Sequence, residues 1–212
     1  MTIPTVTADR LVLRAFTDED VEPLHALLGV GDVMRYFPNA SPPPLDAVQR
    51  LVSGQLKHWE KYGYGWWAVE LPGQASLIGW NGLGFLPETG EVEVAYLLGR
   101  AFWGKGYATE GARASVWFGF QTIGLESIIA IVHPENSASQ RVVEKLGMSF
   151  LDRNRYFGMD CYRRGRVRPT SIARPLSALS TLSVLNVRSA HSARSARRMR
   201  RSHTPAGDVV RR

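Results

Sequence analysis

Hydrophobic and polar positions alternate first over residues 10–16, RLVLRAF, which predicts a strand. Thr17 and the acids after it are typical of a helix N-terminus, and apolar residues then recur at helical spacing as far as Leu28. A proline-rich loop at residues 39–44 separates this helix from a second one. Five apolar positions form the expected inner face of the second helix: Leu45, Val48, Val52, Leu56 and Trp59.

Three strand-like segments follow: GWWAVEL, SLIGWNGLGF and EVEVAYLLG. The turn signals PGQA and LPETG separate them, which predicts an antiparallel meander. A glycine-containing turn then leads into a third helix that ends near Gly124, and the apolar strand SIIAIV and a fourth helix complete the pattern. Because strand, helix and strand in this order form a βαβ unit, the strands on either side of the third helix are expected to run parallel.

The last part of the chain has a different composition. Residues 1–162 contain 13 Lys+Arg and 18 Asp+Glu, whereas residues 163–212 contain 13 arginines and one acid, Asp208. Residues 165–212 also lack aromatic residues and sustained periodicity, so we predict one domain over residues 1–164 and a basic, disordered tail over residues 165–212. Three explanations of this tail stay open: RNA or ribosome contact, an appendage without function, or translation in a shifted reading frame. Its composition favours the third.

Cysteine content and hydropathy limit the classes of protein to consider. Cys161 is the only cysteine, so no intrachain disulfide can form, and the first residues lack the pattern of a secretory signal. No apolar segment approaches the roughly 18 to 20 residues that a membrane-spanning helix needs. We therefore expect a soluble, cytoplasmic protein without membrane contact, whose affinity for nucleic acid, if any, lies in the tail.

The segment AFWGKGYATEGARA, residues 101–114, is the first candidate for chemistry. A glycine-rich turn before a helix exposes backbone N–H groups at the positive end of the helix dipole, which suits a phosphate group. Gly104 and Gly106 would let such a group approach the backbone closely. The spacing alone nevertheless favours an ordinary strand-to-helix turn, and neither GxGxxG nor GxxxxGK[ST] is present.

The context of this segment changes that interpretation. The run EVEVAYLLGRAFWGKGYATEG, followed by VHPENSASQRVVEKLGM, resembles the GNAT superfamily of acetyl-CoA-dependent N-acetyltransferases, and most of all its ribosomal-protein alanine acetyltransferase (Rim-type) branch. TADRLVLRAFTDED, GWWAVEL and LIGWNGLGF are similar to the same branch in the same order, so the resemblance covers residues 7–160. It implies an α/β (α+β) fold: a mixed, mostly antiparallel central sheet with one splayed parallel strand pair and helices on both faces.

The resemblance also implies a site for acetyl-CoA, and no metal. WGKGYA takes the place of the family's pyrophosphate loop, with Trp103 where a glutamine or arginine is usual. The residues implied around the pyrophosphate act chiefly through backbone N–H groups: Trp103, Gly104, Lys105, Gly106, Tyr107, Ala108 and Thr109. Leu97, Leu98 and Gly99, at the end of the preceding strand, are expected to bind the pantetheine arm through their backbone.

Acetyl transfer to an amine requires a base, a polarised thioester carbonyl and a proton for the departing thiolate. Members of this branch often carry a glutamate that faces the acceptor, so Glu93 is the expected base, directly or through water, with Glu91 as the alternative. Asn136 and Ser139 match the family's NxxS segment and are implied coenzyme contacts, and Ser139 is the candidate donor to the leaving sulfur. Many members carry a tyrosine acid one turn later, where this chain has Val143. Helix capping by Asn136 and simple packing of Ser139 stay open as alternatives.

The activity that follows is direct transfer of an acetyl group to a primary amine in a ternary complex. A protein N-terminal amine is the first choice of acceptor, and a polyamine, an aminoglycoside or another small amine is the alternative. A non-catalytic RNA- or ribosome-binding protein that acts through its tail is the remaining hypothesis, although it leaves the coenzyme motifs unused. We expect a monomer or a homodimer.

Overall fold

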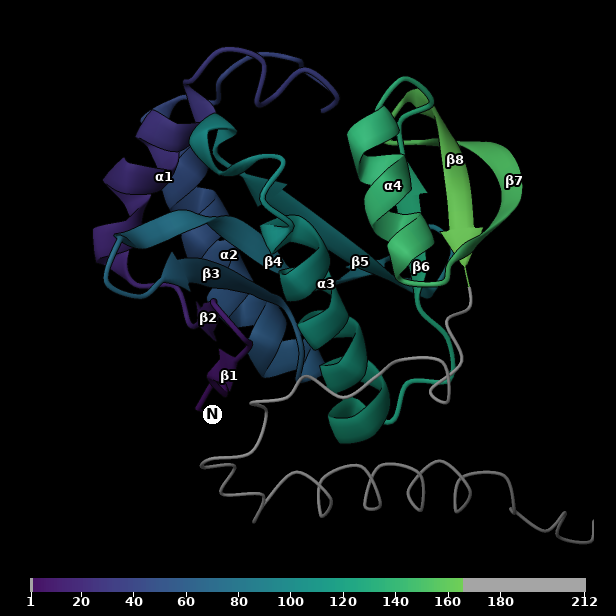
Figure 1. Ribbon diagram of the computed structural model, residues 1–212, viewed down its shortest axis with the longest axis horizontal. Helices are drawn as coiled ribbons and strands as arrows, with labels where there is room; N and C mark the ends of the chain where they lie inside the picture. The colour runs from purple at the N-terminus through teal and green to yellow at the C-terminus, as the bar shows by residue number, and fades with distance from the viewer. Residues whose placement is uncertain (1, 166–212) are drawn as a thin grey trace, which may run out of the picture. The chain divides into compact units, whose positions relative to one another are not determined.

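The computed structural model describes residues 2–165, and its central feature is an eight-stranded sheet (Figure 1). Across the sheet the strands follow the order β1-β2-β3-β4-β5-β6-β8-β7. Their bounds are Val6–Thr7 (β1), Val12–Arg14 (β2), Trp66–Leu71 (β3), Ala75–Leu86 (β4), Glu91–Leu98 (β5), Ile129–Val132 (β6), Ser149–Tyr156 (β7) and Met159–Gly165 (β8). The tail predicted for residues 165–212 lies outside the described residues, apart from Gly165 at the end of β8.

The sheet is antiparallel except for one pair of strands. β3, β4 and β5 form the predicted meander, in which β4 pairs with β5 from Gly79↔Leu98 to Leu86↔Glu91. β5 and β6 run parallel, and their one pairing joins Glu93 to Ile129. The βαβ unit and the mixed, mostly antiparallel sheet are therefore confirmed. Beyond Glu93, the edge of β5 that faces β6 has no strand partner among the described residues.

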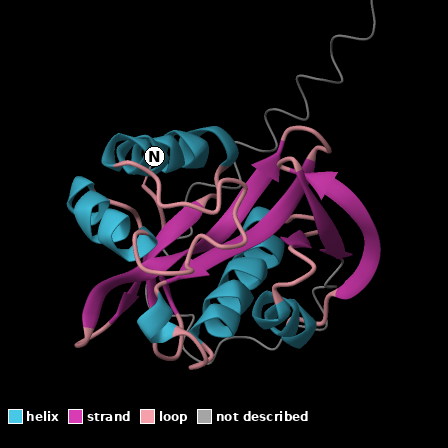
Figure 2. Ribbon diagram, turned by 90° about the horizontal axis from the view of Figure 1, so that it is seen from above, coloured by secondary structure: helices cyan, strands magenta, loops and turns pink. Residues whose placement is uncertain are grey.

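The described α-helices cover both faces of the sheet, as predicted (Figure 2). Their bounds are Val21–Leu28 (α1), Leu45–Tyr62 (α2), Tyr107–Phe118 (α3) and Ser137–Lys145 (α4). Apolar residues of α1 and α2 pack on one face of the sheet, around Trp80 and Leu97. Those of α3 and α4 pack on the other face, around Leu83 and Val94. A π-helical turn continues α3 from Gly119 to Ile123, and Gly124 then ends it with φ +78°, where the sequence predicted the end.

The strand predicted over residues 10–16 is shorter than expected. It is confined to β2, which pairs with β1, a two-residue strand that the hydrophobic pattern did not reveal. The chain reverses direction between them, where the N–H of Ala8 donates to the carbonyl of Leu11 at 2.8 Å. After Arg14 the chain leaves the sheet, because Phe16 packs among the residues of α1 and α2.

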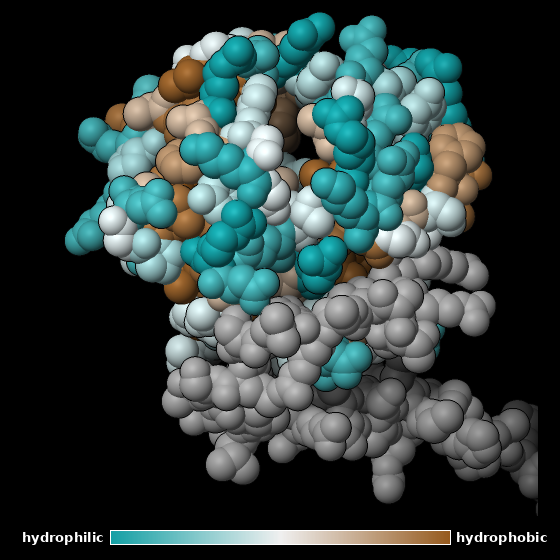
Figure 3. Space-filling view, in the orientation of Figure 1, coloured by the Kyte–Doolittle hydropathy of each residue, from teal (hydrophilic) through white to brown (hydrophobic). Residues whose placement is uncertain are grey.

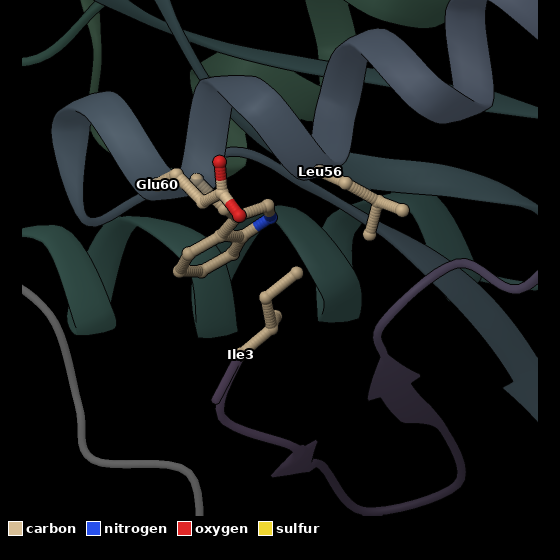
Figure 4. A pocket seen from close by; sticks show the side chains of 4 residues that line it. Ile3, Leu56 and Glu60 are labelled. Carbon is tan, nitrogen blue, oxygen red and sulfur yellow. The ribbon is translucent and has the colours of Figure 1, made fainter. Parts of the chain in front are cut away.

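The predicted inner face of α2 is correct in part. Val48, Val52 and Trp59 are buried, whereas Leu45 and Leu56 are 39% and 37% exposed. Leu56 instead borders a small pocket between α2 and the N-terminal segment (Figure 4). The lining of this pocket consists of Ile3, Leu56, Trp59 and Glu60, and it includes none of the predicted site residues. No helix within residues 2–165 combines the length and hydropathy needed to cross a bilayer.

Candidate active site

Glu93 lies where β5 and β6 separate. It pairs with Gly84 of β4 on one side and with Ile129 of β6 on the other. The residue is only 8% exposed, and its carboxylate has no hydrogen-bond partner or counter-ion among residues 2–165. Burial raises the pKa of Glu93 from 4.5 to about 7, because the ionised form loses hydration without gaining a partner. Such a carboxylate can accept a proton near neutral pH.

Aromatic side chains lie beside Glu93. Trp66 of β3 and Trp80 of β4 stack with 3.9 Å between their ring centroids and 9° between their planes. A Cβ atom at Gly84 would lie 3.5 Å from Trp66 Nε1 and 3.6 Å from Glu93 Oε1. Glycine at this position therefore leaves the indole nitrogen and the carboxylate facing the same space. Trp66 Nε1 is itself buried without a hydrogen-bond partner in the described part of the chain.

Glu91, the alternative base, has a different environment. Its Oε1 accepts a hydrogen bond from Arg163 Nη1 at 2.8 Å, and the same guanidinium pairs with Asp152 of β7. The carboxylate of Glu91 is thus engaged in an ion pair, whereas no side chain within residues 2–165 pairs with that of Glu93. Of the two glutamates, the geometry favours Glu93.

The end of β5 is tied to the loop that follows it. The N–H of Gly99 donates to the carbonyl of Ile78 in β4 at 2.9 Å, whereas the carbonyl of Leu98 accepts from Trp103 Nε1 at 2.7 Å. Trp103 therefore holds the loop against the strand through its indole, a contact that the sequence did not predict. The Leu98 carbonyl, expected to face the pantetheine arm, already has one partner and retains its second lone pair.

The predicted pyrophosphate loop adopts a conformation that needs glycine. Gly104 and Gly106 have φ values of +73° and +84°, and Gly106 is the N-cap of α3. No side chain within residues 2–165 caps this helix, whose first turn begins with Tyr107, Ala108 and Thr109. The first N–H groups of a helix have no partner within it, so they are available to an anion. The donors and the glycine backbone fit a pyrophosphate, while the side chain of Lys105 is exposed with Nζ 5.8 Å from the Phe102 ring.

Arg10 supports this loop from a distant part of the sequence. Its Nε donates to Glu110 Oε2 at 2.8 Å, and its Nη1 donates to the carbonyl of Lys105 at 3.0 Å. The guanidinium also lies over the ring of Tyr107, 4.5 Å from the centroid. Sequence inspection missed Arg10. Its one signal was its place within TADRLVLRAFTDED, because no spacing rule relates residue 10 to a loop that far along the chain.

The start of α4 brings two more predicted residues into position. Asn136 caps the helix, since its Oδ1 accepts from the N–H of Ser139 at 3.0 Å. The Oγ atom of Ser139 lies 2.8 Å from the hydroxyl of Tyr96 in β5. One turn later Val143 is fully buried in the core. Tyr96 was also missed from the sequence, although it alternates with Glu93 and therefore projects from the other face of β5.

Two loops meet near the start of α4. The hydroxyl of Tyr36, in the segment between α1 and α2, donates to the carbonyl of Glu135 at 3.2 Å. Its ring lies 5.2 Å from that of His133, whose Nδ1 accepts from the N–H of Glu135. The space-filling view shows the surface hollowed between the N-terminal end of α3 and α4 (Figure 3). A ligand seated on the loop before α3 would thus have an opening in which to extend.

The arrangement combines groups suited to acid–base chemistry on an anionic ligand. Glu93 lies at the divergence of β5 and β6, the hydroxyls of Tyr96 and Ser139 pair beyond it, and α3 begins with N–H groups that no side chain within residues 2–165 caps. Within residues 2–165, no three His, Cys, Asp or Glu side chains converge where a metal ion could bind. The buried carboxylate and the hydroxyl pair are groups that can transfer protons and form hydrogen bonds.

Comparison with known proteins agrees with this chemistry. The acetyltransferase (GNAT) domain model matches residues 10–149. The chain is 31% identical over 146 residues to YoaA of Bacillus subtilis, an uncharacterized N-acetyltransferase (68% of this chain, 82% of YoaA). It is 27% identical over 144 residues to spermidine N(1)-acetyltransferase of Escherichia coli (68% of this chain, 75% of that protein). A GNAT-family acetyltransferase structure from Bacillus anthracis superposes with a TM-score of 0.67 at 28% identity, covering 77% of this chain and 98% of that one. The chain therefore belongs to the GNAT acetyltransferases and is an acetyl-CoA-dependent acyltransferase.

Proposed function

We propose that this enzyme transfers the acetyl group of acetyl-CoA directly to a primary amine, with a protein N-terminal amine as the preferred acceptor. The observation that carries the proposal is Glu93, a buried carboxylate without a partner among residues 2–165, at the point where the two parallel strands separate. A general base must be accessible to the acceptor nitrogen and must accept a proton near the working pH. The burial of Glu93 supports the second property, and its position where the pairing of β5 with β6 ends supports the first.

The binding of acetyl-CoA is assigned to the loop before α3 and to the end of β5. The N–H groups from Gly104 to Thr109 would hold the pyrophosphate, and the backbone of Leu97, Leu98 and Gly99 would face the pantetheine arm. Bound there, acetyl-CoA supplies an acyl thioester. The protein supplies the base, Glu93, and a hydroxyl donor for the leaving sulfur, Ser139, with Asn136 holding the start of α4 in place.

The pKa of Glu93 supports an α-amine as acceptor. An N-terminal ammonium has a pKa of about 8, whereas an alkylammonium has a pKa of about 10.4. A carboxylate with a raised pKa accepts a proton more readily from the α-ammonium, because that ammonium is the stronger acid of the two. This agrees with the Rim-type resemblance of the sequence. A small polyamine stays the second candidate, because a spermidine acetyltransferase is among the relatives.

A thiol-release assay on the 212-residue protein tests the proposal. Acetyl-CoA is offered with a panel of N-terminal peptides, polyamines and aminoglycosides, using wild type and Glu93→Gln. We expect the highest kcat/KM for an N-terminal peptide and a loss of about 10²- to 10⁴-fold in Glu93→Gln, the range for removal of a general base. Equal rates in the two proteins would exclude Glu93 as the base, and a preference for spermidine would favour the second candidate.

Binding of the donor is tested separately from transfer. A ligand that binds only the folded state raises the melting temperature of the protein. We expect acetyl-CoA to raise it in both wild type and Glu93→Gln, because Glu93 is not part of the predicted pyrophosphate seat. Absence of a shift in wild type at millimolar acetyl-CoA would contradict the assignment of the loop.

A further inference from the structure

Tyr96 and Ser139 form a hydroxyl pair between β5 and α4. The hydroxyl oxygen of Tyr96 lies 2.8 Å from Ser139 Oγ and 3.3 Å from the carbonyl oxygen of Ser139. Tyr96 belongs to the stretch of β5 beyond Glu93, where no pairing with β6 remains, and Ser139 belongs to the first turn of α4. The pair therefore joins two elements across the region where the sheet has divided.

Either hydroxyl of the pair can be the donor in the hydrogen bond between them. Burial raises the pKa of Tyr96 above its ordinary value of 10, so its hydroxyl keeps its proton and can act as a donor. The shorter of its two contacts is to Ser139 Oγ. Donation along this contact occupies a lone pair of the serine oxygen and leaves the serine proton free for another acceptor. Ser139 is half-buried, so an acceptor in the opening can reach this proton.

We propose that Tyr96 is a positioning residue for the departing thiolate: it donates to Ser139 Oγ and thereby directs the serine O–H toward the sulfur. The inference rests on the proposed acetyl transfer. The nitrogen of the neutral amine forms a bond to the carbonyl carbon, and the carbon–sulfur bond breaks. The electron pair of that bond stays on sulfur, which receives a hydrogen bond from Ser139, while the one proton that the nitrogen must lose passes to Glu93. Neither hydroxyl loses its proton, so the step needs only the thioester, the amine and Glu93.

Two features of the chain make the pair suitable for this role. Hydrogen bonds in series polarise one another, so a serine that accepts from Tyr96 is a stronger donor than a serine alone. The residue one turn further along α4, Val143, is buried among core residues and offers no donor. The second hydroxyl thus comes from β5, on the opposite side of the opening.

The ionisation of bound CoA tests the inference without turnover. The 212-residue protein saturated with CoA is titrated with alkali while the ultraviolet absorbance of the thiolate is recorded, and the same titration with desulfo-CoA removes the signals of Cys161 and the tyrosines. We expect the bound thiol to ionise at lower pH than free CoA. In Tyr96→Phe and in Ser139→Ala its ionisation constant should fall by about five- to tenfold, the effect of one hydrogen bond, and the double variant should show no further loss.

A matched control is available in Tyr64, which is buried in the core and distant in sequence from both partners. Tyr64→Phe should leave the ionisation of bound CoA as in wild type. Ser139→Ala removes the hydroxyl that α4 contributes to the pair. We expect this variant to fold, because the Tyr96 hydroxyl can then donate to the carbonyl of residue 139, which lies 3.3 Å away. Unchanged thiol ionisation in either Tyr96→Phe or Ser139→Ala would overturn the inference.

Kinetics separate this inference from the proposed function. Tyr96→Phe should lower kcat by about five- to tenfold and leave the KM for acetyl-CoA unchanged. A wild-type enzyme that acetylates its amine at the same kcat as Tyr96→Phe would overturn the inference and leave the proposed function standing. A wild-type enzyme that binds CoA yet transfers to no amine would overturn the proposed function, while the thiol titration would still report on the pair.

Discussion

Arg10 and Glu110 form an ion pair although 100 positions separate them in the sequence. The backbone N–H of Arg10 donates to Glu110 Oε1 at 2.6 Å, and its guanidinium Nη2 lies 2.7 Å from Oε2. Since Arg10 also binds the carbonyl of Lys105, the segment before β2 fixes both the loop and the first turns of α3. The N–H groups proposed to bind pyrophosphate are thus held in place before any ligand arrives.

Replacing Arg10 should weaken the binding of acetyl-CoA more than it slows transfer. We expect Arg10→Met to raise the Kd by about tenfold, equivalent to loss of about 1.4 kcal/mol, with kcat changed little. The Kd of Arg10→Lys should lie between those of wild type and Arg10→Met, because an ammonium cannot bind Glu110 and the Lys105 carbonyl with the same forked geometry. Calorimetric titration with acetyl-CoA measures the change. Arg50→Met removes an exposed pair with Asp46 on α2 and serves as the control, and an equal loss there would contradict the assignment.

Within the loop, the backbone should matter more than the charge. Gly106 has φ +84°, a conformation that costs a β-branched residue of the order of 1–3 kcal/mol, so Gly106→Val should weaken the binding of acetyl-CoA by roughly 5- to 150-fold. Lys105→Ala should weaken binding only modestly, because the side chain is exposed and screened. Gly124→Val introduces comparable strain at φ +78° beyond the end of α3 and should bind acetyl-CoA normally. Calorimetry that ranked Lys105→Ala below Gly106→Val in affinity would refute this description of the loop.

The protonation of Glu93 should be visible in stability. Its folded-state pKa, about 7, lies above its ordinary value of 4.5. The stability linked to its protonated form is therefore fully present below about pH 4.5 and is lost as the pH rises through 7. We expect Glu93→Gln to be more stable than wild type at pH 8, by an amount on the order of 3 kcal/mol, and to show little difference at pH 4.5.

Denaturant unfolding at the two pH values measures this difference. Glu88→Gln, at an exposed turn between β4 and β5, is the matched control and should follow wild type at both. A wild-type protein as stable as Glu93→Gln at pH 8 would mean that the carboxylate is not buried without a partner.

The two roles of Asn136 can be separated by substitution. Asn136→Ala removes the cap of α4 and should lower stability by about 1 kcal/mol. Asn136→Ser keeps a capping oxygen and should recover most of that stability in a thermal melt. If Asn136 also contacts the coenzyme, the affinity for acetyl-CoA stays reduced in both variants. Full recovery of affinity in Asn136→Ser would limit the residue to capping.

The pattern of the sequence predicted most of the sheet because local signals decide it. The meander follows from alternating runs separated by the turns PGQA and LPETG, and the parallel pair follows from the βαβ order. The pairing of β1 with β2 was missed because Val6–Thr7 is too short to show a period. The burial predicted for Leu45 and Leu56 was wrong, because helical periodicity shows the direction in which a side chain points but not how far the neighbouring elements extend over it.

The candidate site was predictable where backbone geometry carries it. Their residue type alone indicated a loop at Gly104 and Gly106, and both residues have positive φ. Contacts that side chains make with residues of other elements were not predictable. Nothing near Tyr96 in the sequence indicates Ser139, and Trp103 gave no sign that its indole would bind the strand it follows. Such contacts arise only when separate elements are packed together.

The single pairing between β5 and β6 determines where the two strands can move apart. A fork that opens and closes moves least at its vertex and most at its tips, and Glu93 with Ile129 forms that vertex. Spreading of the two arms to admit or release a bulky ligand would displace α3 and α4 relative to each other while the carboxylate kept its place. The fold thus places Glu93, the proposed proton acceptor, at the point that such spreading would move least.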